Sequence, residues 1–234
     1  MYKLAVFDMD GTILDTIRDL TSGVNHALKA KGYPERTVEE MRIIVGNGIR
    51  RSIELAAPEG LSENELNELH EIFKPYYAEH SADTTCAYPG IKELLERLRA
   101  AGIKTAVVSN KADTAVKDLA EKYFPGLFDE AIGEHAGVNR KPAPDEVMLA
   151  LDSLGIEAKD AVYIGDSEVD ILTAKNSGLD GIFVEWGFRT RESLEKSGAT
   201  RICKTTDEVF EIISEAPCPA RVQENIDLKR GYRL

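Results

Sequence analysis

Residues 4–12 read LAVFDMDGT, an apolar run that ends in two aspartates and a glycine. The run from Leu4 to Phe7 has the length and composition expected of a buried β-strand. Because side chains alternate along an extended chain, Asp8 and Asp10 should leave this strand on the same side. In open α/β sheets, ligands bind at the carboxyl ends of the strands near a reversal of strand order. The stretch therefore predicts either a ligand site with two carboxylates or a solvated turn capped by aspartate.

The rest of the chain repeats an alternation of strand-like and helical segments. Gly102 and Gly155 stand where two of the helices should stop. Alternation of this kind predicts an α/β fold, a parallel sheet covered by helices. The expected strands are residues 4–7, 103–108, 131–132, 161–164 and 182–184. The expected helices are residues 91–101, 114–123 with Asp113 as N-cap, and 145–154.

Residues 16–80 interrupt this alternation with helical patterns alone. Capping boxes are expected at residues 37–40 and 62–65, and Pro75 predicts a kink or an end in the last helix. Two connections, residues 14–16 and 81–90, would join the insertion to the sheet as a hinge. We therefore expect a core of residues 1–15 and 83–216, an all-helical cap of residues 16–82, and a C-terminal tail of residues 217–234.

The charge balance of the 234-residue chain restricts its partners. Its 29 basic and 41 acidic side chains give a formal net charge of −12, which disfavours binding to nucleic acid or to an anionic membrane. A phosphate ligand would then need a locally positive site. Three distant cysteines and the lack of a long apolar run predict a cytoplasmic protein with reduced thiols. Whether the chain is a monomer or a homodimer stays open.

Further polar residues stand after later strands or before a helix. Asp166 and Asp170 follow the strand at residues 161–164, Ser109 and Asn110 follow the strand at residues 103–108, and Lys141 precedes a helix. Taken singly, each fits a surface turn or a helix cap. Two acidic clusters at strand ends, however, suit Mg²⁺, which commonly takes one or two carboxylates together with waters and phosphate oxygens. One carboxylate from each cluster and a backbone carbonyl would suffice.

These motifs together resemble those of the haloacid dehalogenase superfamily. DMDGT (residues 8–12), VVSN (107–110), KPAPD (141–145) and GDSEVD (165–170) stand in the order and spacing of its four motifs. The resemblance covers roughly residues 1–215. It implies a Rossmann-like core with a helical cap inserted after the first motif, and the activity of a Mg²⁺-dependent phosphatase.

The resemblance also implies a role for each motif residue. Asp8 would attack phosphorus and form an aspartyl-phosphate, while Asp10 would act as general acid and base. Mg²⁺ would be held by Asp8, the backbone carbonyl of Asp10, and Asp166, with Asp170 orienting the site or capping its helix. We also expect Asp8 and Asp10 to raise each other's proton affinity, which would keep Asp10 protonated. The expected phosphate-binding residues are Thr12, Ser109, Asn110 and Lys141.

A glycine-rich turn in the cap offers the clue to the substrate. The turn at residues 46–48 resembles the cap loop of phosphoglycolate phosphatases, so that Gly46, Asn47, Gly48 and Arg50 are expected to bind a small phosphorylated metabolite, 2-phosphoglycolate first. A plain helix–helix connection is the alternative. Other activities stay open: a pyrophosphatase, a sugar phosphatase, a β-phosphoglucomutase-like phosphomutase or a catalytically silent binding module. The absence of histidine from residues 15–20 disfavours the phosphomutase.

Overall fold

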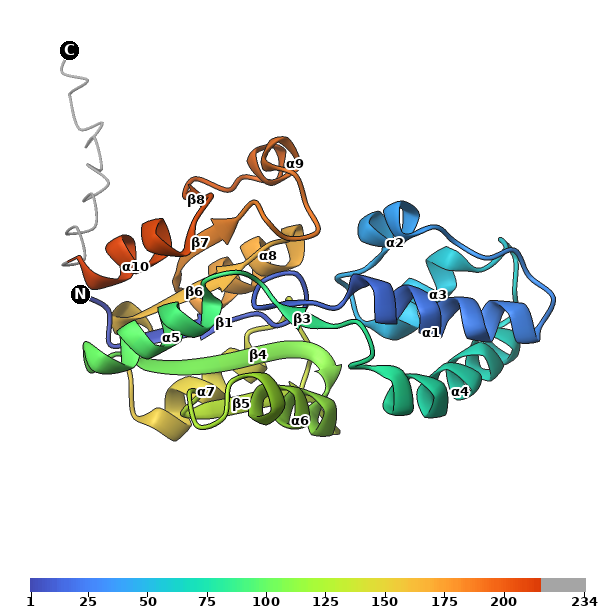
Figure 1. The fold of residues 1–234 in the computed structure, drawn as a ribbon, viewed down its shortest axis with the longest axis horizontal. Helices are drawn as coiled ribbons and strands as arrows, with labels where there is room; N and C mark the ends of the chain where they lie inside the picture. The colour runs from blue at the N-terminus through green and yellow to red at the C-terminus, as the bar shows by residue number, and fades with distance from the viewer. Residues whose placement is uncertain (216–234) are drawn as a thin grey trace, which may run out of the picture.

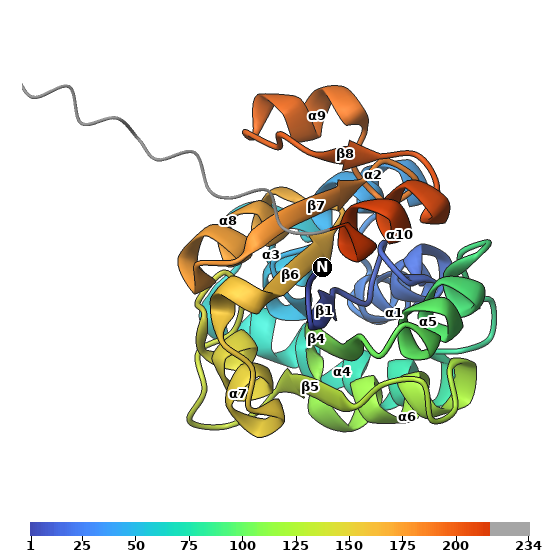
Figure 2. The same ribbon diagram turned by 90° about the vertical axis from the view of Figure 1, so that its left-hand side faces the viewer.

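A parallel sheet of six strands forms the centre of the larger part of the molecule (Figures 1 and 2). The computed structural model describes residues 1–215 of the chain. The strand order is β5-β4-β1-β6-β7-β8 and every pair is parallel, so the chain winds from the central β1 first to one edge and then to the other. The predicted α/β fold is confirmed. The strands are β1 (Leu4–Phe7), β4 (Lys104–Ala112), β5 (Glu130–Glu134), β6 (Ala161–Gly165), β7 (Asp180–Val184) and β8 (Ile202–Cys203).

Helices bury both faces of this sheet. Along β1, Ala5 and Phe7 pack into one apolar cluster, whereas Leu4 and Val6 pack into another. One face is covered by α5 (Ile91–Ala100), α6 (Asp113–Tyr123) and α10 (Thr206–Ser214). The other is covered by α7 (Asp145–Leu154), α8 (Glu168–Ser177) and α9 (Arg191–Lys196). A strand buried on both sides reads as a continuous apolar run, as residues 4–7 do.

Four helices form a separate group beside the carboxyl end of the sheet (Figure 1). They have an apolar cluster of their own, which includes Val24, Ile53, Leu69 and Phe73. Both predicted capping boxes are present, at Thr37 with Glu40 and at Ser62 with Glu65. The helices are α1 (Ile17–Ala30), α2 (Val38–Ile44), α3 (Ile49–Ala56) and α4 (Glu63–His80).

Two very short strands connect this helical group to the sheet. β2 (Leu14–Asp15) pairs antiparallel with β3 (Cys86–Ala87), so the outgoing and returning chains lie side by side. Asp19 at the start of α1 accepts hydrogen bonds from the backbone and hydroxyl groups of Thr84 and Thr85, at distances of 2.5–3.1 Å. The proposed boundaries of the cap are residues 16 and 82. The first directly follows β2, and the second lies between α4 and β3.

Several local predictions need correction. Of the two outcomes predicted at Pro75, the helix end is wrong, because α4 continues to His80; α6 begins at Asp113 itself with Ala112 as N-cap. Strand β4 extends to Ala112, beyond the predicted end at residue 108, and β8 was not predicted. The predicted tail, residues 217–234, lies outside the described residues. Within residues 1–215, no helix combines the length and apolarity that a membrane span requires.

Candidate active site

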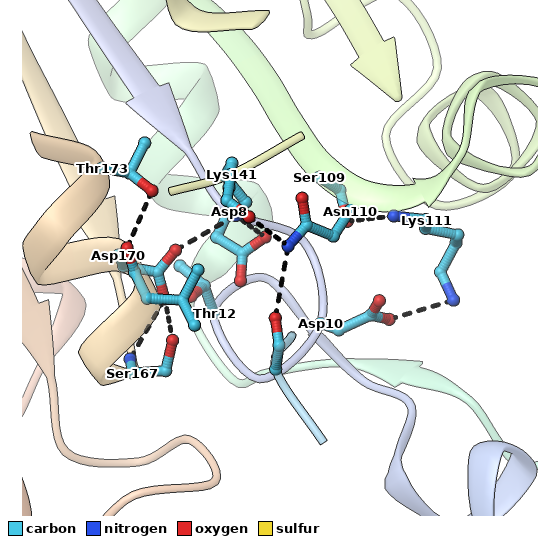
Figure 3. A network of polar contacts seen from close by, with 12 residues as sticks. Asp8, Asp10, Thr12, Ser109, Asn110, Lys111, Lys141, Ser167, Asp170 and Thr173 are labelled. Carbon is cyan, nitrogen blue, oxygen red and sulfur yellow. Dashed lines mark hydrogen bonds and ion pairs between the residues drawn. The ribbon is translucent and has the colours of Figure 1, made fainter. Parts of the chain in front are cut away.

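The predicted core residues come together at the carboxyl end of the sheet (Figure 3). β1 lies between β4 and β6, so the segments that follow these three strands are neighbours. Asp8 follows β1, Asp166 follows β6, and Ser109 lies in the last part of β4. All three are buried, with exposed fractions of 8%, 1% and 1%. The doubly wound topology therefore brings residues more than 50 positions apart to one point.

Lys141 is the centre of a buried polar network. Its ammonium donates to Asp8 Oδ1 at 2.7 Å, to the hydroxyl of Tyr163 at 2.9 Å and to Asp170 Oδ1 at 3.0 Å. Burial alone would lower the pKa of Lys141, but the charges of Asp170 and Asp8 outweigh it and raise that pKa well above its usual value. Among the described residues, none donates a hydrogen bond to the other carboxylate oxygen of Asp8. The network therefore holds Asp8 through Oδ1.

Asp170 both orients the site and caps a helix. Its Oδ2 accepts from the backbone N–H of Asp166 at 3.2 Å and from Ser167, at 3.1 Å from the backbone N–H and 2.6 Å from the hydroxyl. Ser167 and Asp170 together form the capping box of α8. The other oxygen of Asp170 holds Lys141, so the carboxylate positions both the turn that carries Asp166 and the lysine beside Asp8.

Three carboxylates lie close enough to share a cation. Ligand oxygens of Asp8, Asp166 and Asp170 are within 4.8 Å of one another. Burial raises the pKa of Asp8 well above its usual range despite Lys141, and Asp170 and Asp166 add to the effect. Burial and then Asp170 raise the pKa of Asp166 to about 7. Because only one ammonium faces three carboxylates, ionisation of all three would leave uncompensated negative charge, and their oxygens fit a hard divalent cation such as Mg²⁺.

Gly11 allows the first motif to approach Asp166. Its φ of +88° is rarely adopted by residues with a side chain, and an added Cβ would lie 2.4 Å from Asp166 Oδ2. Any larger residue would therefore push the turn of residues 9–12 away from the carboxylate that follows β6. The glycine in this motif is required by close packing at the site.

Asp10 belongs to a second polar group, which faces the cap. Its carboxylate accepts from the hydroxyl of Thr16 at 2.7 Å and lies 3.3 Å from the ammonium of Lys111, which in turn donates to Tyr77 of α4 at 2.7 Å. The carboxylates that most raise the pKa of Asp8 are Asp170 and Asp166 rather than Asp10. The expectation that Asp10 raises the proton affinity of Asp8 is therefore not supported, since Asp10 turns toward Thr16 and Lys111.

The predicted phosphate-binding residues divide into two kinds. Ser109 and Lys141 line the cavity in front of Asp8, as expected. Thr12 does not line it, because its fully buried hydroxyl donates to Asp166 Oδ1 at 3.3 Å. Asn110 lines the cavity, but its amide donates to the backbone carbonyls of Lys141 at 3.0 Å and Gly46 at 3.4 Å. Asn110 therefore connects the core to the cap.

A cavity of about 780 Å³ lies between the sheet and the four helices. Of the cap residues expected to contact substrate, Gly46 and Gly48 line it, whereas Asn47 and Arg50 do not. Arg50 is turned toward the start of α4, where its guanidinium pairs with Glu63 at 2.7 Å. Its expected role in substrate binding is therefore not supported, because an acidic neighbour on the next helix occupies the side chain.

The structure adds cavity residues that the motifs did not identify. Lys111 belongs to the Ser-Asn-Lys stretch of residues 109–111 but was not among the expected phosphate-binding residues, and it also lines the cavity. The ring of Tyr77 lies in the apolar interior of the cap, while its hydroxyl accepts a hydrogen bond from Lys111. The other additions include residues that no local pattern indicated, among them His70, Lys74, Glu134, His135 and Phe188.

The fold and the buried acidic site define a class of hydrolase. The haloacid dehalogenase-like hydrolase family model matches residues 5–184, and the chain belongs to this family. The predicted family and the hydrolase class are thereby confirmed, and the relatives support phosphatase function. Two are phosphoglycolate phosphatases, from Vibrio parahaemolyticus (31% identity, 91% of this chain and 96% of the relative) and Aquifex aeolicus (31%, 80% and 86%). A solved structure of a candidate phosphoglycolate phosphatase from Lactobacillus delbrueckii subsp. bulgaricus has 44% identity and a TM-score of 0.87, over 91% of this chain and 98% of that one.

Proposed function

We propose that this protein hydrolyses a small phosphate monoester, 2-phosphoglycolate, through an aspartyl-phosphate on Asp8. The observation that carries the proposal is the setting of Asp8, a buried carboxylate that lines the cavity, with one oxygen held by Lys141 and the other without a hydrogen-bond donor among the described residues. A carboxylate nucleophile divides one difficult displacement into two easier ones. The relatives named above support the choice of substrate.

In the first step, the free oxygen of Asp8 forms a bond to phosphorus while the bond from phosphorus to the leaving oxygen breaks. The leaving oxygen takes the electron pair and accepts a proton from Asp10. In the second step, water attacks the phosphorus of the aspartyl-phosphate, loses a proton to Asp10, and releases Asp8 and phosphate. Asp10 lines the same cavity as Asp8, which supports its use in both steps.

Charge on the phosphoryl oxygens would be stabilised by groups that the fold already positions. Lys141 and Ser109 line the cavity beside Asp8, where these oxygens would lie. Asp8, Asp166 and the backbone carbonyl of Asp10 would hold Mg²⁺, with Asp170 supporting them. When bound, the ion supplies positive charge that offsets the carboxylates and the phosphoryl group.

The proposal is tested by a phosphate-release panel with purified protein. The substrates are 2-phosphoglycolate, p-nitrophenyl phosphate, pyrophosphate and several sugar phosphates, each with Mg²⁺ and with excess chelator. We expect the highest kcat/KM on 2-phosphoglycolate, and loss of turnover in chelator that Mg²⁺ restores. A higher kcat/KM on a sugar phosphate would make that compound the substrate in place of 2-phosphoglycolate. Full activity in chelator would reject the metal assignment.

A further inference from the structure

The loop after β7, residues 186–189, touches the acidic site and the cap together. The backbone N–H of Phe188 donates to Asp166 Oδ2 at 2.6 Å. The side chain of the same residue packs into the apolar cluster of the cap, and the guanidinium of Arg42 lies 6.0 Å from its ring. Phe188 therefore contributes its backbone to a proposed metal-binding carboxylate and its side chain to the cap interior.

Arg189 continues this connection with charged hydrogen bonds. Its Nε and Nη2 donate to the two carboxylate oxygens of Glu168 at 2.8 and 2.9 Å. The same guanidinium donates to the backbone carbonyl of Arg42 and, at 2.8 Å, to that of Val45. Only 10% of the Arg189 side chain is exposed. One side chain thus joins Glu168, two positions after Asp166, to the end of α2.

The cap segment that Arg189 holds also lines the cavity. Val45 and Gly46 both line it, and the carbonyl of Gly46 receives the amide of Asn110 from the core. The segment is therefore held from two sides, by Arg189 beyond β7 and by Asn110 at the end of β4. These contacts exist only when the cap lies against the core as it does here.

Arginine is suited to this position for physical reasons. Its planar guanidinium has five donors and can bind a carboxylate with two parallel bonds while others reach carbonyl oxygens. The last carbonyls of a helix lack partners within the helix, and a positive charge near them is favourable. If the cap moved away, the α2 carbonyls and Arg189 would lose these partners and exchange them for water.

We propose that Arg189 is a positioning residue that couples closure of the cap to the acidic site, by tying residues 42–46 to the turn that carries Asp166. Glu168 holds the guanidinium on the core side, and Phe188 relays the connection to Asp166. The inference rests on the proposed function for its kinetic consequence, since a closed cap over Asp8 matters only if the reaction occurs there. Its structural consequence does not depend on activity.

The structural consequence is tested by hydrogen exchange of the free protein. We expect Arg189→Met to speed exchange of the backbone amides in residues 42–48 by about tenfold or more, because a buried hydrogen-bonded cation is removed. Arg189→Lys should give an intermediate result, since one ammonium cannot replace the guanidinium geometry. Arg191→Gln is the matched control, because Arg191 begins α9 two positions after Arg189 and pairs with Glu185 and Glu195. Equal exchange in wild type and Arg189→Met would overturn the proposal.

The kinetic consequence is measured on the same variants with 2-phosphoglycolate and p-nitrophenyl phosphate. For Arg189→Met we expect KM for 2-phosphoglycolate and the half-saturating Mg²⁺ concentration to rise by about tenfold, with a smaller change in kcat. A fall in kcat alone, with unchanged exchange and Mg²⁺ dependence, would reject the coupling role. A wild-type protein inactive on both substrates would instead reject the proposed function and leave the exchange result to decide on Arg189.

Discussion

The sheet side and the cap side of the cavity are built differently. On the sheet side, Asp8 and Asp170 are buried and both accept hydrogen bonds from the buried ammonium of Lys141. On the cap side, Gly46 contributes only its backbone to the cavity wall. Lys74 contributes a side chain that is half-exposed and forms an ion pair with Glu71. The first arrangement has little freedom, and the second lies on helices joined to the core by two short strands. We infer that the rigid side performs the chemistry and the attached side selects the substrate.

The strongest test of this contrast is removal of the nucleophile on the rigid side. Asp8→Asn should lower kcat by at least about ten-thousandfold, because an amide can neither attack phosphorus nor replace the carboxylate charge. Phosphate release from 2-phosphoglycolate measures the effect, and thermal unfolding should show that the fold is retained. Asp118→Asn, at an exposed position on α6, is the matched control. Turnover within tenfold of wild type would remove Asp8 from its proposed role.

The sheet side was also the part that could be predicted. Asp8 and Asp166 follow apolar runs, and the carboxyl ends of parallel strands necessarily share one edge. Nothing comparable sets where Arg50 or Arg189 point, since long side chains choose among partners that only the folded protein brings near. In the folded protein, Arg50 pairs with Glu63 and Arg189 pairs with Glu168. This is why the motifs predicted the residues that gather at the sheet edge better than they predicted the cap contacts.

Two errors in the secondary structure have similar physical causes. β2 and β3 are two residues long, too short for any pattern, and depend on each other for their hydrogen bonds. Pro75 should have weakened α4, yet the helix continues because Phe73 and Tyr77 on either side of it are buried in the cap interior. In both places tertiary contacts outweigh local preference.

A smaller effect is expected from the cap loop. Gly48 has a φ of +79°, and an added Cβ would lie 2.9 Å from the guanidinium of Arg140. Gly48→Val should therefore displace the loop and lower kcat/KM for 2-phosphoglycolate about tenfold more than for p-nitrophenyl phosphate, whose size makes it less dependent on a closed loop. Steady-state kinetics on both substrates measure the ratio.

Gly60→Val provides the control for backbone strain. Gly60 also has a positive φ, +85°, but no atom lies within 4 Å of its added Cβ. This variant should be less stable than wild type but should have the same ratio of kcat/KM values for 2-phosphoglycolate and p-nitrophenyl phosphate. If both glycine variants lower kcat/KM equally for the two substrates, the loop supports folding alone. Substrate selectivity must then come from another part of the cavity.

Glu146 is a buried residue of α7 on the sheet side that has no part in the proposed reaction, and it tests how burial of a carboxyl group affects stability. Its two oxygens are buried without a hydrogen-bond partner among the described residues, and burial, with Glu134 adding to it against Lys141, raises its pKa to about 7. Unfolding would return that pKa to its ordinary value near 4.5. The native state therefore binds more protons, so its stability falls as pH rises from about 4.5 to 7 and stays lowered above that range.

Glu146→Gln should remove this pH-dependent loss. We expect the variant to be more stable than wild type at about pH 8 by on the order of 2 kcal/mol, and the difference to shrink by about pH 5.5. Urea unfolding of both proteins at the two pH values measures it. A difference that is independent of pH would show that Glu146 ionises freely in the native state.

The smallest expected effect is that of Arg50→Ala, which addresses the cap side directly. Arg50 forms an ion pair with an 84% exposed Glu63 side chain and does not line the cavity. Exposed pairs of this kind contribute about 0–1 kcal/mol to stability, so kcat/KM for 2-phosphoglycolate should stay within about twofold of wild type. Arg51→Ala is the matched control, since Arg51 is adjacent and pairs with Glu54 on the same helix. If Arg50→Ala alone raised KM by tenfold or more with kcat unchanged, Arg50 would have to leave Glu63 and reach the substrate during turnover. The cap side would then rearrange on substrate binding, whereas the hydrogen bonds from Lys141 to Asp8 and Asp170 are expected to hold the sheet side in place.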